Sequence, residues 1–310
     1  MNFIPEEREE NSAYSQLLII ALYALIGLIF GTILSIIVLI LMYGSGIMHN
    51  GAALSGGDPA FASGLKISQV FTTVFTFIAP PVLLARREKI KIDSFYHFKK
   101  PTVYLFFIVL VIMICSAPLM ECLALANQKM ILPDFLKSIE NWMREKEDAA
   151  MKMTLLLLRI DNAGDFIINL LVIALLPAIA EELLFRGAVQ RSFNRMFNNP
   201  HIAIWITAFI FSAIHVQFFG FFPRMLLGAA FGYIYLWTGS LWYAMFAHFL
   251  NNAFAVCQAW YFQLHHIPLD QADNSSNFPW YGYVISVILT IFLLKYLKDQ
   301  TKQGNGEQLD

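Results

Sequence analysis

Long apolar stretches separated by short polar segments are the dominant pattern of this chain. A helix that crosses about 30 Å of hydrocarbon needs roughly 20 residues, at about 1.5 Å of rise per residue. Eight stretches approach this length, and they cover approximately residues 17–43, 66–85, 102–125, 166–186, 202–219, 224–238, 241–262 and 280–297. The sixth is the shortest and is bracketed by glycine and proline. The pattern predicts an all-α fold, a polytopic membrane helix bundle with about eight transmembrane helices.

The segment 128–165, between the third and fourth stretches, has a different pattern. It carries Lys and Arg among acidic residues, and its apolar residues Phe135, Ile139, Trp142 and Met143 have the spacing of one helical face. Such a pattern is typical of amphipathic helices that lie in the membrane interface. We therefore expect one or two interfacial helices here, although an ordinary exposed helical hairpin fits the same pattern.

The composition agrees with a membrane protein. Of the 310 residues, 58% are hydrophobic and 14% are charged, and the mean hydropathy is +0.59. An ordinary soluble domain has about 25% charged residues. The net charge of −1 provides no basic surface for binding nucleic acid, which we exclude as a partner. The expected surroundings are a lipid bilayer.

The distribution of basic residues predicts the orientation of the bundle. Lys and Arg follow the second, fourth and eighth stretches, whereas the loops after the first and seventh stretches contain neither. Basic residues in short loops mark the cytoplasmic side. We therefore expect an integral protein of the cell (plasma) membrane with both termini cytoplasmic, a membrane domain at 16–298, and polar tails at 1–15 and 299–310.

Five ionisable residues lie within or at the end of these apolar stretches. Ionisable groups inside a bilayer cost several kcal/mol unless they are paired or hydrated, so they indicate a functional site. Glu182 and Arg186 are four residues apart and can form a structural ion pair on one helix face. Glu181 points about 100° away without a local partner, which favours a chemical role. His215 and His248 are expected in mid-span, where two histidines are difficult to explain by packing alone.

These residues fall into three short motifs, which occur in order within about residues 165–255. They read Glu181-Glu182-x-x-x-Arg186, then Phe211-x-x-x-His215, then His248-x-x-x-Asn252. The set resembles the motifs of the CPBP intramembrane proteases, the group that contains the type II CAAX prenyl endopeptidases and the bacteriocin self-immunity proteins. The resemblance implies that this region is the catalytic core of a membrane-embedded endopeptidase whose substrate is a peptide or a membrane protein.

The resemblance also implies roles for the motif residues. Glu181 and His215 would activate a water molecule, and His248 and Asn252 would stabilise the oxyanion that forms at the attacked carbonyl. Imidazole and amide N–H groups are suitable donors to an oxyanion, where one donor is worth about 3 kcal/mol. The remaining two residues of the first motif would support the site by positioning it.

A metal ion is the alternative way to activate water. Two histidines and a carboxylate form the ligand set of a catalytic zinc site, here Glu181, His215 and His248. The usual HExxH spacing is absent, and the two histidines come from different helices. We favour hydrolysis without a cofactor and keep a divalent metal such as zinc as the alternative.

Other functions and other nucleophiles fit the sequence less well. A non-enzymatic bacteriocin-immunity or scaffold protein on the same fold is the main alternative function. An ion-coupled transporter should show inverted repeats and paired broken helices, which the sequence lacks. Ser212 shares a helix face with His215 but is better explained as a packing residue, and Cys257 is expected on the face opposite His248.

Overall fold

The computed structural model describes residues 10–48, 58–267 and 278–304, and within these ranges the regular structure is helical, without strands. The N-terminal half contains α1 (Ala13–Tyr43), α3 (Ala62–Thr73), α4 (Ala79–Glu88), α5 (Ile92–Phe95), α6 (Val103–Gln128) and α7 (Lys137–Leu157). The C-terminal half contains α8 (Ala163–Asn169), α9 (Leu176–Glu182), α10 (Arg191–Phe197), α11 (Pro200–Ala213), α12 (Phe221–Thr238), α13 (Leu241–Leu264) and α14 (Trp280–Gly304). Three π-helical segments join neighbouring helices into longer ones: η3 (Val74–Ile78), η5 (Leu170–Leu175) and η6 (Leu183–Gln190). Short 3₁₀ turns are η1 (Ser45–Met48), η2 (Pro59–Phe61), η4 (Asp134–Leu136) and η7 (Phe218–Gly220).

The predicted polytopic helix bundle is confirmed. Six helical segments are long and apolar enough to cross a membrane: Ala13–Tyr43, Pro59–Glu88, Val103–Gln128, Ala163–Phe197, Phe218–Thr238 and Trp280–Lys302. The two other predicted spans correspond to α11, which has only 14 residues, and α13, whose 24 residues include His248 and two asparagines. By length and composition, the described residues therefore support six of the eight predicted spans.

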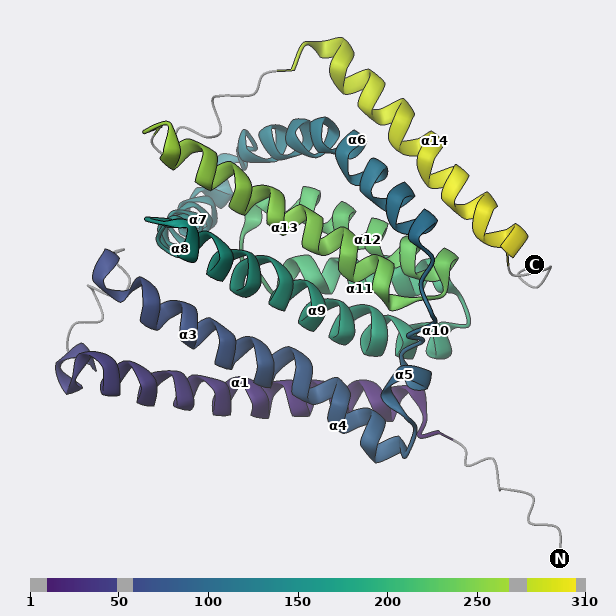
Figure 1. The fold of residues 1–310 in the computed structure, drawn as a ribbon, viewed down its shortest axis with the longest axis horizontal. Helices are drawn as coiled ribbons and strands as arrows, with labels where there is room; N and C mark the ends of the chain where they lie inside the picture. Colours follow the sequence, from purple (N-terminus) through teal and green to yellow (C-terminus); the bar gives the residue numbers. More distant parts are fainter. Residues whose placement is uncertain (1–9, 49–57, 268–277, 305–310) are drawn as a thin grey trace, which may run out of the picture.

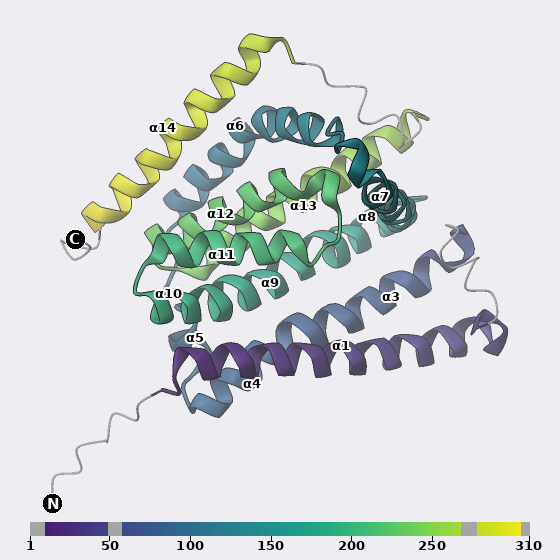
Figure 2. The same ribbon diagram turned by 180° about the vertical axis from the view of Figure 1, so that it is seen from behind.

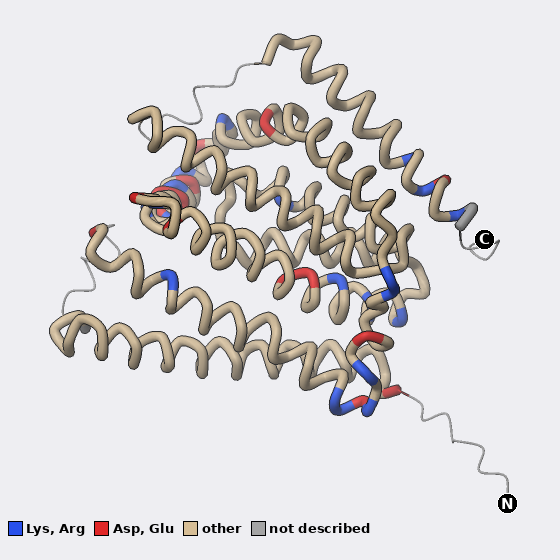
Figure 3. The backbone as a smooth tube through the Cα atoms, in the orientation of Figure 1, with Lys and Arg blue, Asp and Glu red and all other residues tan. Residues whose placement is uncertain are grey.

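The helices of the bundle are arranged in layers (Figures 1 and 2). Helices α1, α3 and α4 lie on one side, α9 to α13 form the centre, and α6 and α14 lie on the other side. The first turn of α1 and the last turn of α14 are at the same end of the bundle. Charged residues gather at the two ends, and few interrupt the middle (Figure 3).

Small residues bring α1 close to the backbone of its neighbour. Gly27, Gly31 and Ser35 recur every four residues and are buried against α3 and η3. A Cβ atom on Gly31 would lie 3.1 Å from the carbonyl oxygen of Phe71, and one on Gly27 would overlap the carbonyl oxygen of Phe75. Small residues at this spacing are a common way for membrane helices to pack without a hydrophobic driving force.

We expect Gly27→Ala to destabilise the purified protein by about 1–3 kcal/mol, because the added methyl group must push α1 away from η3. Thermal denaturation in detergent measures this loss. Gly46→Ala is the matched control, since a Cβ atom there meets nothing within 4 Å. Equal melting temperatures for the two variants would contradict the close approach of the helices.

Helix α7 is the amphipathic element predicted in the segment 128–165. It is seen nearly end-on in Figures 1 and 2, so it lies across the end of the bundle opposite the first turn of α1. Its buried Glu140 accepts hydrogen bonds from Arg144 Nε at 2.9 Å and from Lys137 Nζ at 3.2 Å. The bond from Arg144 is the main cause that holds the pKa of Glu140 below its ordinary value. The segment forms one long helix preceded by a short 3₁₀ turn.

Parts of the predicted tails and loops lie outside the described residues. These parts are 1–9 and 305–310 in the two tails, 49–57 in the loop after α1, and 268–277 in the loop after α13. The predicted C-terminal tail was expected to begin at residue 299, whereas α14 continues to Gly304.

Candidate active site

The first motif lies where α9 passes into the π-helix η6. Glu182 is the last residue of α9, and Arg186 is in η6, whose eight residues are all buried. The predicted ion pair is present: Arg186 Nη1 donates to Glu182 Oε1 at 2.7 Å, and both side chains are fully buried. Glu181 is 15% exposed at its side chain, so the two glutamates have different surroundings. Single π-helical turns of this kind are frequent at functional sites.

Helix α12 is attached to η6 through two backbone carbonyl groups. Arg186 Nη2 donates to the carbonyl oxygen of Gly228 at 2.8 Å, and Gln190 Nε2 donates to that of Gly232 at 3.3 Å. A Cβ atom on Gly232 would lie 2.7 Å from Gln190 Oε1. The glycines of α12 therefore provide the space in which the polar side chains of η6 reach its backbone.

His248 in α13 completes a buried cluster with both glutamates. Its Nδ1 lies 2.8 Å from Glu182 Oε1, the oxygen that also accepts from Arg186. Its Nε2 lies 3.8 Å from Glu181 Oε2. Because an ionised carboxylate only accepts hydrogen bonds, the hydrogen of the Nδ1 contact belongs to the histidine. Nε2 is then the ring atom that faces Glu181.

His215 does not lie in mid-helix, as the sequence pattern predicted. Helix α11 ends at Ala213, and Val216 has a left-handed backbone conformation with φ of 53°. A β-branched residue in this conformation interrupts a helix. His215 therefore lies in the turn just after α11, where its Nδ1 is 2.7 Å from the carbonyl oxygen of Phe211. Since that oxygen only accepts, Nδ1 carries the hydrogen and Nε2 keeps a lone pair.

The aromatic ring of Phe211 brings the three motifs together. Its centroid is 5.1 Å from the ring of His215 and 6.0 Å from the ring of His248, both in edge-to-face arrangements. The Arg186 guanidinium lies over the same ring at 4.7 Å. Phe231 of α12 stacks on His248 at 5.3 Å. One phenylalanine thus contacts a residue of each motif, and its contact with His215 is local because the two residues are four positions apart.

Asn252, one turn after His248 in α13, points toward a different helix. Its Nδ2 donates to the carbonyl oxygen of Ile173 in η5 at 3.5 Å, and its Oδ1 accepts from Asn251 at 3.3 Å. The amide is therefore engaged by the backbone of the helix that leads to Glu181.

The metal alternative concerns Glu181, His215 and His248. Within the described part of the chain, no three His, Cys, Asp or Glu side chains are grouped so that they could hold one metal ion. Nδ1 of each histidine bonds to an oxygen of the protein, which leaves Nε2 as the nitrogen that would face a metal.

The alternative nucleophiles are occupied or remote. Ser212 Oγ donates to the carbonyl oxygen of Phe221 at 2.7 Å, so it fixes the start of α12. Cys257 is exposed, whereas His248 on the same helix is buried. Neither residue is placed to act with a histidine.

Arg224 is a residue of this region to which the sequence assigned no role. Its charge interacts with Glu181 and with Glu147 of α7, and it is also the main charged neighbour of His215. The signal in the sequence was its isolation, because it is the one Lys, Arg, Asp or Glu between residues 201 and 263.

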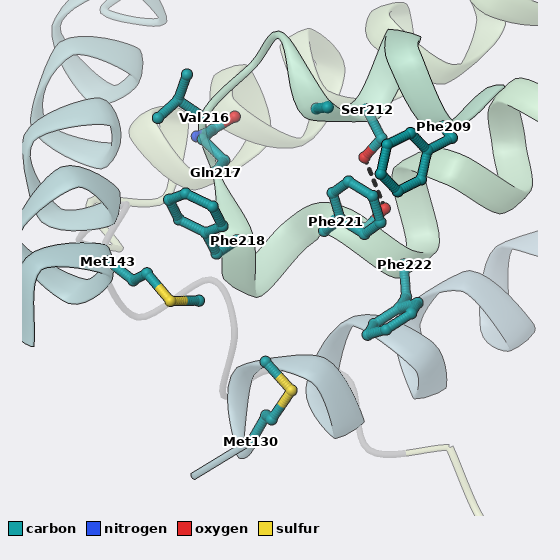
Figure 4. Close-up of a pocket in the computed structure, with 10 residues that line it drawn as sticks. Met130, Met143, Phe209, Ser212, Val216, Gln217, Phe218, Phe221 and Phe222 are labelled. Atoms are coloured by element: carbon teal, nitrogen blue, oxygen red, sulfur yellow. Dashed lines mark hydrogen bonds between the residues drawn. The ribbon is translucent and has the colours of Figure 1, made fainter. Parts of the chain in front are cut away.

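An apolar cavity of about 320 Å³ adjoins the turn that carries His215 (Figure 4). Val216 and Gln217 belong to its lining, and the other side chains that line it come from the segment just after α6, from α7, α11 and η7, and from the start of α12. They include Met130, Met143, Phe209, Phe218, Phe221 and Phe222. The hydrogen bond from Ser212 to Phe221 closes one side of it.

Comparisons with known proteins identify this region. A family model described as "Type II CAAX prenyl endopeptidase Rce1-like" matches residues 163–254, which include all three motifs. The uncharacterized protein YpbD of Bacillus subtilis (strain 168) is 32% identical over 110 residues, which are 34% of this chain. The match spans 52% of the length of that relative, about half. No solved structure matches the chain. Residues 163–254 are therefore similar to the Rce1-like type II CAAX prenyl endopeptidases, in agreement with the resemblance carried by the three motifs.

Proposed function

We propose that this integral membrane protein is an intramembrane endopeptidase that hydrolyses a peptide bond with water activated by glutamate and histidine. The match of its residues 163–254 to the model of a membrane protease family supports a hydrolase that acts on peptides within a bilayer. The observation that carries the finer proposal is the buried cluster around Phe211, in which both histidines and the first motif meet.

In this proposal, Glu181 and Nε2 of His215 together activate one water molecule by accepting hydrogen bonds from it. One proton leaves the water, and the resulting hydroxide attacks the carbonyl carbon of the substrate. The tetrahedral oxyanion then collapses, the C–N bond breaks, and the proton passes to the leaving amine. His248 and Asn252 are assigned to the oxyanion; donation from Nε2 of His248 requires the imidazolium form, because Nδ1 already donates to Glu182. General acid–base catalysis of this kind contributes typically about 10²- to 10⁴-fold to a rate.

Glu182 and Arg186 act on the geometry of the site in this proposal. Glu182 accepts from Nδ1 of His248, which directs Nε2 of that ring toward Glu181. Arg186 neutralises Glu182 and ties it to α12 through Gly228. Fixing a ring through its second nitrogen is how many histidines are oriented for catalysis.

The proposed orientation follows from the charges at the end of the bundle where α1 begins and α14 ends. Arg191 and Arg195 of α10 pair with Glu10, which lies just before α1, and basic residues are also seen in the last turns of α14 (Figure 3). Basic loops favour the cytoplasm. We place the termini in the cytoplasm and the protein in the plasma membrane. Helix α7 then lies on the outer side.

The function is tested by comparing the membrane peptidome of cells that make the wild-type chain with that of cells that make Glu181→Gln. Cleavage products present only with the wild type are expected, because the variant lacks the proposed base. Glu145→Gln, the same change on an exposed residue of α7, is the matched control and should give the wild-type products. Identical peptidomes for wild type and Glu181→Gln would favour a non-enzymatic role on this fold.

A further inference from the structure

Arg224 forms no salt bridge with another described residue, although it lies in an apolar region. It lies in the first turn of α12, and no other Lys, Arg, Asp or Glu occurs between residues 201 and 263. A charge in such a place is retained when it is paired or functional. Its side chain therefore needs an explanation.

The two terminal nitrogens of Arg224 have different surroundings. Nη2 donates to Gln217 Oε1 at 2.6 Å, which fixes the guanidinium beside the turn that carries His215. Nη1 is buried and has no hydrogen-bond partner among the described residues. Leaving a buried donor unpaired lowers stability, so this nitrogen is a donor that the fold keeps free.

Arg186 shows what a structural arginine looks like in the same region. Both of its terminal nitrogens are used, Nη1 by Glu182 and Nη2 by the carbonyl of Gly228, and its guanidinium lies over Phe211. Arg224 is near enough to Glu181 for their charges to interact, yet its Nη1 is left open. Both terminal nitrogens of Arg186 are thus bonded, with only its Nε left without a partner, whereas the terminal nitrogen Nη1 of Arg224 has none among the described residues.

We propose that Arg224 is a substrate-binding residue, whose Nη1 donates a hydrogen bond to an sp² oxygen of the bound peptide, either a main-chain carbonyl or a carboxylate. This inference rests on the proposed function, since it takes the cluster around Phe211 as the reaction site. Arginine suits the task because its planar fork can hold Gln217 with one nitrogen and a peptide oxygen with the other.

The apolar cavity supplies room for the same peptide. Gln217, which holds Arg224, also lines the cavity between Val216 and Phe218 (Figure 4). A peptide with an apolar side chain in this cavity would place its backbone near Gln217, the residue that accepts from Nη2 of Arg224. The flexible side chains of Met130 and Met143 allow the cavity to accept apolar groups of different shapes.

The test uses the full chain in detergent micelles and a defined library of apolar peptides, each made as a free acid and as a C-terminal amide. Dissociation constants are measured in the Glu181→Gln background, which is not expected to cleave, and KM and kcat are measured with active protein. Arg224→Gln should raise Kd and KM about ten- to a hundredfold and change kcat little, as expected for a lost charge-assisted hydrogen bond. Arg159→Gln, which removes an exposed ion pair with Asp161, is the matched control and should change neither constant.

The two peptide series distinguish the source of the oxygen. A loss of affinity confined to the free acids identifies a carboxylate, and an equal loss in both series identifies a main-chain carbonyl. If Arg224→Gln does not fold, Arg224→Lys replaces it; lysine keeps the charge but has a single nitrogen, so a several-fold weaker Kd is expected.

Unchanged Kd and KM in the folded variant, or a lower kcat alone, would overturn the assignment of Arg224. Binding that depends on Arg224 in a wild-type protein that cleaves none of the peptides would instead count against the proposed protease function. The two failures are therefore distinguishable.

Discussion

Glu181→Gln is expected to lower the rate of peptide cleavage by about 10²- to 10⁴-fold while the protein stays folded. The amide has nearly the shape of the carboxylate but cannot accept a proton from water. Glu181 also approaches His248 only at 3.8 Å, so its charge can be removed without breaking a short hydrogen bond between them. The measurement is kcat/KM of the purified variant in detergent, together with its melting temperature.

Glu182→Gln provides the contrast within the same pair of residues. Glu182 accepts hydrogen bonds from both Arg186 and His248, so its replacement should lower the melting temperature as well as the activity. A folded Glu181→Gln variant with wild-type kcat/KM would remove Glu181 from the mechanism. Equal losses of stability in both variants would show that the two glutamates do not have separate roles.

Arg186→Met is expected to reduce the free energy of unfolding by about 3–5 kcal/mol, the largest loss of stability that we predict. The substitution leaves the Glu182 carboxylate buried with His248 as its remaining partner, and it removes the donor to the carbonyl of Gly228. The contact of the guanidinium with Phe211 is lost as well. Thermal or denaturant unfolding in detergent measures the change.

The double variant Glu182→Leu/Arg186→Met tests the cause of that loss. Replacing a whole buried ion pair with apolar residues is often neutral or stabilising, so the double variant should recover most of the lost stability. It should stay inactive, because His248 loses the acceptor that orients its ring. A double variant less stable than Arg186→Met would refute the buried charge as the cause.

The sequence predicts those parts of the structure that depend on neighbours along the chain. Apolar length predicts most of the membrane helices, and the spacing of four residues predicts the ion pair of Glu182 and Arg186, because i and i+4 share a helix face. The amphipathic period of 128–165 predicts α7 for the same reason. In each case the interaction is decided within a few helical turns.

The contacts between helices could not be predicted in this way. His215 was expected within a helix, but the helix ends at Ala213 because the chain turns at Val216. The spacing of the apolar residues does not change at that turn, so the sequence pattern could not predict it. The bond between His248 and Glu182 joins residues 66 positions apart. The sequence shows that Arg224 is isolated from other charged residues. That Gln217 and Glu181 are its neighbours is decided by the packing of the helices.

Because Glu182 and Arg186 belong to one continuous helical segment, their charges can compensate each other before any other helix is present. If the segment from α8 to α10 enters the lipid as one helix, its acid and base are already in contact before α12 and α13 are made. The free-energy cost of moving this segment from the translocation machinery into lipid is thereby lowered, and Glu181 is the main acidic residue that still adds to it. The ion pair within one helical segment thus has two consequences. It helps a polar segment to enter the membrane, and it positions the groups that surround His248.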